Sequence, residues 1–148
     1  MPRPSCRILQ RPGSRKTSSP TERWTPSTSG LAVPIGTANP LVDGVHRSVG
    51  EVVFRLPGSS HEFRLQAEEE KLGALTVTFH DETNGDTTDE WRKLSLPRPR
   101  PDGSVVLDFN RAINYPSAFT PYGTCPMPVR NNSLDVKIEA GEKEPGLF

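Results

Sequence analysis

Side chains that can act as nucleophiles, bases or ligands gather in one stretch near the C-terminus, from Val105 to Lys143. Cys125 is the one cysteine in this stretch. A nucleophilic role for its thiol would require a base, and His80 is the available partner. The alternative is that Cys125 is a small buried apolar residue at a proline-rich turn. The sequence leaves both interpretations open.

Metal binding and paired-acid chemistry would draw on this stretch and on residues 80 and 81. The candidate ligands are one histidine, three acidic residues and one thiol: His80, Asp81, Asp108, Glu142 and Cys125. None of them stands in an HxH, CxxC or HExxH spacing, so we predict no metal site and assign no cofactor. Paired acids remain undefined because the sequence does not give the separation of two carboxylates. A hydrolase or transferase that uses Cys125 or the Asp108 region is kept as an alternative function.

The remaining polar residues of the stretch have a structural interpretation and a ligand-binding one. Asp and Asn side chains bond nearby backbone groups, and a long loop needs such bonds because its amides and carbonyls have no strand partner. The same residues would also line a pocket beneath the 110–132 loop. The leading function hypothesis is therefore a domain that binds a small molecule or a protein partner there. Its predicted ligand-binding residues are Asp108, Asn110, Asn114, Cys125, Asn132 and His80.

Six apolar runs would position these side chains. They are residues 46–56, 61–67, 74–82, 91–96, 104–110 and 133–141. In the second run Phe63, Leu65 and Ala67 alternate with polar residues, which is typical of a half-buried strand. No segment shows a helical stripe of useful length. The pattern predicts an all-β domain: a single antiparallel β-sandwich or partly open barrel of about six strands with a long ordered loop.

The N-terminal part of the chain has a different composition. Residues 1–44 contain 22 Pro, Ser, Thr or Gly, and residues 1–30 carry six basic residues and one acidic residue. We predict a disordered basic arm over 1–44 and the β domain over 45–148, because the arm lacks the apolar surface that would offset its ordering entropy. Basic residues do not interleave with aromatic ones, which disfavours nucleic-acid binding.

Cysteine content and hydropathy bear on location. Cys6 and Cys125 are too few for a disulfide framework, and we expect two free thiols in a reducing compartment. No apolar run approaches the roughly 20 residues of a membrane span. The N-terminus lacks the apolar core of a secretory signal. A cytoplasmic location is the expectation.

The run LDFNRAINYPSAFTPYGTCPMPVRNNSLDVKIEAGEK resembles the C-terminal signature of the domain of unknown function 1684 family, and VTFHDETNG is similar to the family's Phe-x-Asp-x-Thr-x-Gly. The signature elements fall on Asp108-Phe109-Asn110, Asn114, Ala118-Phe119, Cys125-Pro126-Met127-Pro128, Asn132-Ser133-Leu134 and Ile138-Glu139-Ala140-Gly141-Glu142. The resemblance covers about residues 45–144 and implies a compact, largely β domain with no established reaction.

The chain departs from the family pattern at two places. TTDEWRKL lacks the family's tyrosine and glycines, with Arg92 standing for the family arginine. The family's Asn-Pro-Pro-Cys is replaced by residues 114–117, NYPS, so a second cysteine is missing. These departures support a third hypothesis, that the domain is a structural or inactive remnant.

Overall fold

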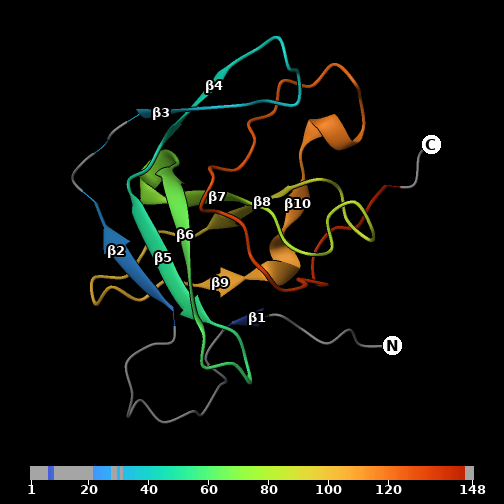
Figure 1. The fold of residues 1–148 in the computed structure, drawn as a ribbon. Coiled ribbons are helices and arrows are strands. Elements are labelled where there is room, and N and C mark those ends of the chain that lie inside the picture. Colours follow the sequence, from blue (N-terminus) through green and yellow to red (C-terminus); the bar gives the residue numbers. More distant parts are fainter. Residues whose placement is uncertain (1–6, 9–21, 28–29, 31, 146–148) are drawn as a thin grey trace.

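The fold is built around one open antiparallel sheet. The computed structural model describes residues 7–8, 22–27, 30 and 32–145. Six strands pair in the order β10-β8-β7-β6-β5-β2 (Figure 1). They are β2 (Arg23–Pro26), β5 (Gly50–Arg55), β6 (Glu62–Glu69), β7 (Leu75–Phe79), β8 (Arg92–Leu96) and β10 (Ile113–Asn114). The sheet does not close into a barrel, and the prediction of an all-β antiparallel fold is confirmed.

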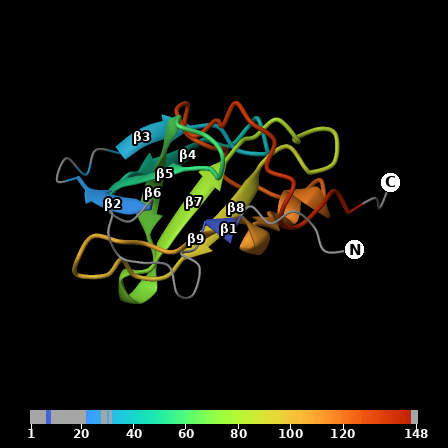
Figure 2. The same ribbon diagram turned by 90° about the horizontal axis from the view of Figure 1, so that it is seen from below.

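Two small ribbons and three short 3-10 helices complete the described part of the chain. One ribbon pairs β3 (Ala32–Ile35) with β4 (Gly44–Arg47), and the other pairs β1 (Arg7–Ile8) with β9 (Leu107–Asp108). The two ribbons lie on opposite sides of β5 to β8 (Figure 2). The helices are η1 (Lys71–Gly73), η2 (Phe109–Arg111) and η3 (Pro116–Ala118). No helix in the described ranges is long and apolar enough to cross a membrane.

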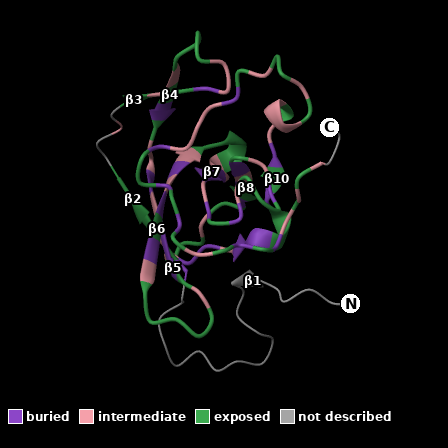
Figure 3. Ribbon diagram, turned by 45° about the vertical axis from the view of Figure 1, so that its right-hand side comes forward, coloured by how far each residue is buried: buried purple, intermediate pink, exposed green. Residues whose placement is uncertain are grey.

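The core lies where the sheet bends. The strand β6 pairs with β5 along residues 62–67, but with β7 only at Glu68 and Glu69. The sheet therefore opens into two halves that face each other. Phe109 lies between them, with its ring 5.7 Å from Phe54 of β5 and 5.5 Å from Phe79 of β7. Buried residues gather between these strands, whereas the β3–β4 ribbon and the loop tips are largely exposed (Figure 3).

The C-terminal run was predicted to be a strand and is not one. Residues 133–141 contain no strand, although Leu134, Ile138 and Ala140 are buried in alternation with exposed neighbours. The segment makes single backbone bonds to the chain after β7, such as Leu134 N–H to His80 O at 2.9 Å. Several of its carbonyls are instead bonded by a side chain. Of the predicted strand over 104–110, only β9 forms, and η2 begins directly after it.

Part of the predicted arm contains strands. The edge strand β2 pairs with β5, and β3 forms a ribbon with β4, so ordered structure begins before residue 45. These strands are four residues each and gain their bonds at a sheet edge or in a ribbon, where a long apolar run is unnecessary. Residues 1–6 and 9–21 of the predicted arm lie outside the described residues.

Candidate functional site

Asp108 and Asn110 form the start of η2. The Asp108 carboxylate accepts hydrogen bonds from the backbone N–H of Asn110 at 3.1 Å and from its side-chain amide at 3.0 Å. An Asp that caps the first free amides of a helix has this geometry because those amides lack partners within the helix. The pair thus holds the turn that places Phe109 in the core.

Asn132 joins β6 to β7 where the two strands separate. Its side chain is fully buried. The amide oxygen accepts from Gln66 N–H at 2.8 Å, and the amide nitrogen donates to the carbonyls of Gln66 and Thr78 at 2.9 and 3.0 Å. These backbone groups lie beyond the last β6–β7 pair, so Asn132 supplies the bonds that the missing ladder would have made.

The side chains of Asn114 and His80 also contact backbone groups. Asn114 donates through its amide nitrogen to the Lys143 carbonyl at 2.9 Å and to the Glu142 carboxylate at 3.1 Å. The ring nitrogen Nδ1 of His80 lies 2.9 Å from the Glu90 carbonyl oxygen. Cys125 is a buried free thiol that forms no hydrogen bond with His80.

A buried ion pair holds the irregular segment 133–141 in place through hydrogen bonds to its backbone. The role of this pair was not evident from the sequence. Arg92 and Asp81 have fully buried side chains, 3.3 Å apart. The Arg92 guanidinium also donates to the carbonyls of Ile138 at 2.8 Å, Ala140 at 2.7 Å and Glu142 at 3.3 Å. The planar donor fork of an arginine suits several carbonyls at once. The available signal in the sequence was Arg92 itself, which stands for the family arginine in TTDEWRKL.

The Asp81 carboxylate accepts further hydrogen bonds besides those of Arg92. Its oxygens accept from the backbone N–H and hydroxyl of Thr83, the side-chain amide of Asn84 and the backbone N–H of Ile138. The candidate metal ligand Asp81 is thus already saturated by donors. No group of three or more His, Cys, Asp or Glu that could hold a metal ion occurs in the part of the chain that the structure describes.

One cavity is lined in part by residues of the 110–132 loop. Its volume is about 390 Å³. Three segments line it: the turn between β3 and β4, the end of the loop before β8, and the loop after β10. Its lining residues are Thr37, Ala38, Pro40, Asp89, Glu90, Trp91, Ser117, Thr120, Pro121, Gly123 and Met127. We call it the loop pocket. None of the six predicted ligand-binding residues lines it, although His80 bonds the Glu90 carbonyl at its border.

The loop pocket combines two carboxylates with one aromatic residue. Asp89 and Glu90 form no ion pair with a described basic residue. Trp91 is 4% exposed. Gly36 lets the two covering segments approach each other, because a Cβ there would lie 2.9 Å from the sulfur of Met127. The arrangement places two acidic residues next to a buried tryptophan.

Two polar side-chain pairs involve the strands β6 and β7: Glu68 of β6 with His46, and Thr78 of β7 with Tyr115. Burial raises the pKa of the Tyr115 hydroxyl above its ordinary value of 10.0, against the hydrogen bond with Thr78, which lowers it. Tyr115 therefore stays protonated at neutral pH. Nearby, His46 Nδ1 lies 3.3 Å from Glu68 and holds the pKa of that carboxyl below its ordinary value of 4.5.

The open six-stranded antiparallel sheet, bent around an aromatic core, defines an all-β domain. Residues 19–143 match the family described as Protein of unknown function (DUF1684), and the chain belongs to it. The match begins well before residue 45 and includes β2 and β3.

The chain also resembles a solved structure. It is the solution NMR structure of the uncharacterized protein from gene locus rrnAC0354 of Haloarcula marismortui, which is 25% identical with a TM-score of 0.64. The similarity covers 86% of this chain and 71% of that one. No curated protein matches the chain.

Proposed function

We propose that the domain binds a small cationic ligand, such as an alkylammonium compound, in the loop pocket. The observation that carries the proposal is that two acidic residues without a described cationic partner, Asp89 and Glu90, line one cavity together with Trp91. Carboxylates attract a cation, and an aromatic face binds a weakly hydrated ammonium group.

The size of the loop pocket supports a small molecule. Its volume of about 390 Å³ lies at the lower end of the range of roughly 300–1,000 Å³ that is typical of ligand sites. Thr37, Ser117 and Thr120 add hydroxyl groups to the wall, which can orient a polar end of the ligand. An anionic ligand of the same size would meet two negative charges and be repelled.

Choline and its uncharged isostere 3,3-dimethyl-1-butanol test the proposal directly. In a Trp24→Phe background, Trp91 is the one remaining tryptophan and its fluorescence reports on the loop pocket. We expect choline to bind with a dissociation constant of about 1 mM or tighter. The uncharged isostere should bind at least about fivefold more weakly, because it lacks the cation–π and carboxylate attraction.

Charge-matched variants identify the site. Asp89→Asn and Glu90→Gln should each weaken choline binding, whereas Asp86→Asn removes the same charge from an exposed residue outside the pocket lining and should leave it unchanged. Equal binding of choline and the isostere, or equal loss in all three variants, would contradict the proposal. Protein melting temperature in each variant separates lost binding from lost folding.

A further inference from the structure

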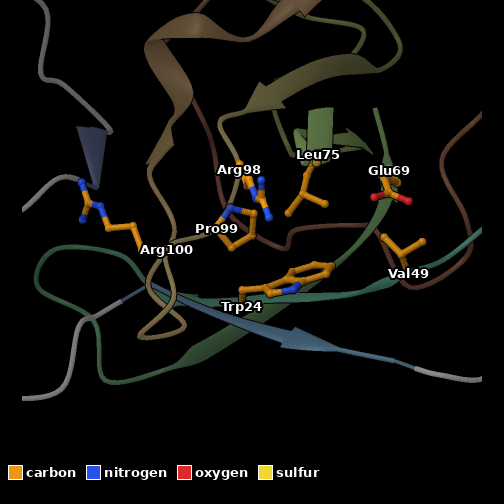
Figure 4. Close-up of a pocket in the computed structure, with 8 residues that line it drawn as sticks. Trp24, Val49, Glu69, Leu75, Arg98, Pro99 and Arg100 are labelled. Atoms are coloured by element: carbon orange, nitrogen blue, oxygen red, sulfur yellow. The ribbon is translucent and has the colours of Figure 1, made fainter. Parts of the chain in front are cut away.

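A second groove shares no lining residue with the loop pocket. Figure 4 shows the residues that line this groove. It opens between β2, the 3-10 helix η1 and the connection after β8, and its volume is about 510 Å³. The lining residues are Trp24, Val49, Glu69, Gly73, Leu75, Arg98, Pro99 and Arg100. We call it the Trp24 groove.

The indole of Trp24 forms a fixed floor. Trp24 of β2 pairs with Val52 of β5, and the Trp24 backbone N–H donates to the Gly103 carbonyl at 2.7 Å. The ring packs closely on the β5 backbone, because a Cβ added to Gly50 would lie 2.6 Å from the indole. In Figure 4 the ring lies along the bottom of the groove, and Leu75, Arg98 and Pro99 lie across the space above it.

Arg98 brings a positive charge to this space. Its guanidinium forms no ion pair, hydrogen bond or ring contact with the residues that the structure describes. Its aliphatic stem is placed by Gly73, where a Cβ would lie 3.1 Å from the Arg98 Cδ. The arginine is thus positioned by packing while its charged end stays available.

The two ends of the Trp24 groove differ in charge. Figure 4 shows the Glu69 carboxylate at one end, next to Val49, and Arg98 toward the other. The Arg100 side chain also carries a positive charge but extends away from Trp24. A ligand that lies across the indole would therefore have one anionic group directed toward Arg98.

We propose that the Trp24 groove binds a flat aromatic ring that carries one anionic group. The ring stacks between the Trp24 indole and the apolar side chains of Leu75 and Pro99, and the anion pairs with Arg98. Stacking on an aromatic side chain is favourable for any flat π-system, and a guanidinium pairs with phosphate or carboxylate. The inference is independent of the function proposed for the loop pocket.

Three nucleotide fragments separate the two contributions. AMP has both a ring and an anion, adenosine has the ring alone, and ribose 5-phosphate has the anion alone. Binding to the full chain is followed by NMR through the indole N–H signals, which Trp24→Phe and Trp91→Phe assign. We expect AMP to shift the Trp24 signal and to bind at least about tenfold more tightly than either fragment. A further arm with 2-naphthoate shows whether a carboxylate replaces the phosphate.

Two arginine variants with the same charge change locate the anion. Arg98→Gln should weaken AMP binding at least about tenfold and leave adenosine binding unchanged, because only the anion contact is removed. Arg100→Gln should leave both unchanged. Equal effects of the two variants would show that general charge, and not the groove, attracts AMP. The proposal is overturned by that result, or if neither AMP nor 2-naphthoate shifts the Trp24 signal.

Discussion

Substitution of Asn132 tests whether a predicted ligand-binding residue is a structural bridge. Its side chain satisfies three backbone groups, the buried Thr78 C=O and the partly buried Gln66 N–H and Gln66 C=O. Asn132→Leu has similar bulk and no polar atoms, so all three groups lose their partner. Each buried unsatisfied group costs about 1–3 kcal/mol, and partial relaxation leaves a total of roughly 3–5 kcal/mol.

Urea unfolding followed by circular dichroism measures this loss. With a slope of about 2 kcal/mol per M, the unfolding midpoint should fall by roughly 1.5–2.5 M. Asn132→Asp should be at least as harmful, because a carboxylate oxygen would face the carbonyls of Gln66 and Thr78 in place of an amide donor. Amide exchange at Gln66 should accelerate in both variants.

Asn131 supplies the matched control. It is exposed and adjacent, and Asn131→Ala should change the free energy of unfolding by less than about 0.5 kcal/mol. The reasoning fails if Asn132→Leu also unfolds within about 1 kcal/mol of the unsubstituted protein, since no buried amide bridge is then being lost. Asn132 would in that case be free to serve a ligand.

Three further predictions concern the buried and titratable groups. Arg92→Met should destabilise the fold by about 3–5 kcal/mol in urea unfolding, because Asp81 and the C-terminal carbonyls lose their donor. Arg92→Lys should recover only part of this stability. Unchanged stability of Arg92→Met would contradict the role of the ion pair. The pKa of Glu68 is lowered by its hydrogen bond with His46. Its stabilising contribution should therefore be present above about pH 4.5 and be lost as the pH falls below that value. In Glu68→Gln the melting temperature should fall less steeply as the pH is lowered through this range. Burial raises the pKa of Tyr115, so its contribution should be lost only as the pH rises above about 10. Absorbance at 295 nm should show one tyrosine that ionises late, and Tyr115→Phe should remove it.

The central strands could be predicted because alternation along them reflects burial on one face. Phe63, Leu65 and Ala67 are all buried on β6, as their spacing indicated. The same signal misled at residues 133–141, where alternate residues are buried without a strand partner. Periodicity reports which side chains face the core, whereas hydrogen-bond pairing depends on what lies alongside. Here the guanidinium of Arg92 takes the place of a neighbouring strand.

The candidate site was only partly within reach of the sequence. The predicted pocket was assigned to residues of the signature, whereas the walls of the loop pocket come from three segments distant in sequence, near residues 37–40, 89–91 and 117–127. Only tertiary structure brings these together. The polar residues of the signature were predicted to form one site because they are close in sequence. Asn114 and Asn132 bond backbone groups, as their structural interpretation required.

The buried polar bonds explain how a cavity can exist at this place in the fold. The edge strand β10 is two residues long, and the chain beyond it leaves the sheet without further strand pairing. A loop without a ladder can remain ordered only if its backbone groups find other partners. The Asn132 side chain anchors the end of the loop to Gln66 and Thr78, and Arg92 anchors the segment that follows it. The middle of the loop is bonded to the turn of the β3–β4 ribbon, where Ala38 N–H donates to the Cys125 carbonyl and Met127 N–H donates to the Gly36 carbonyl. Ligand binding in the loop pocket should therefore weaken when either anchor is removed, even though neither side chain lines the cavity.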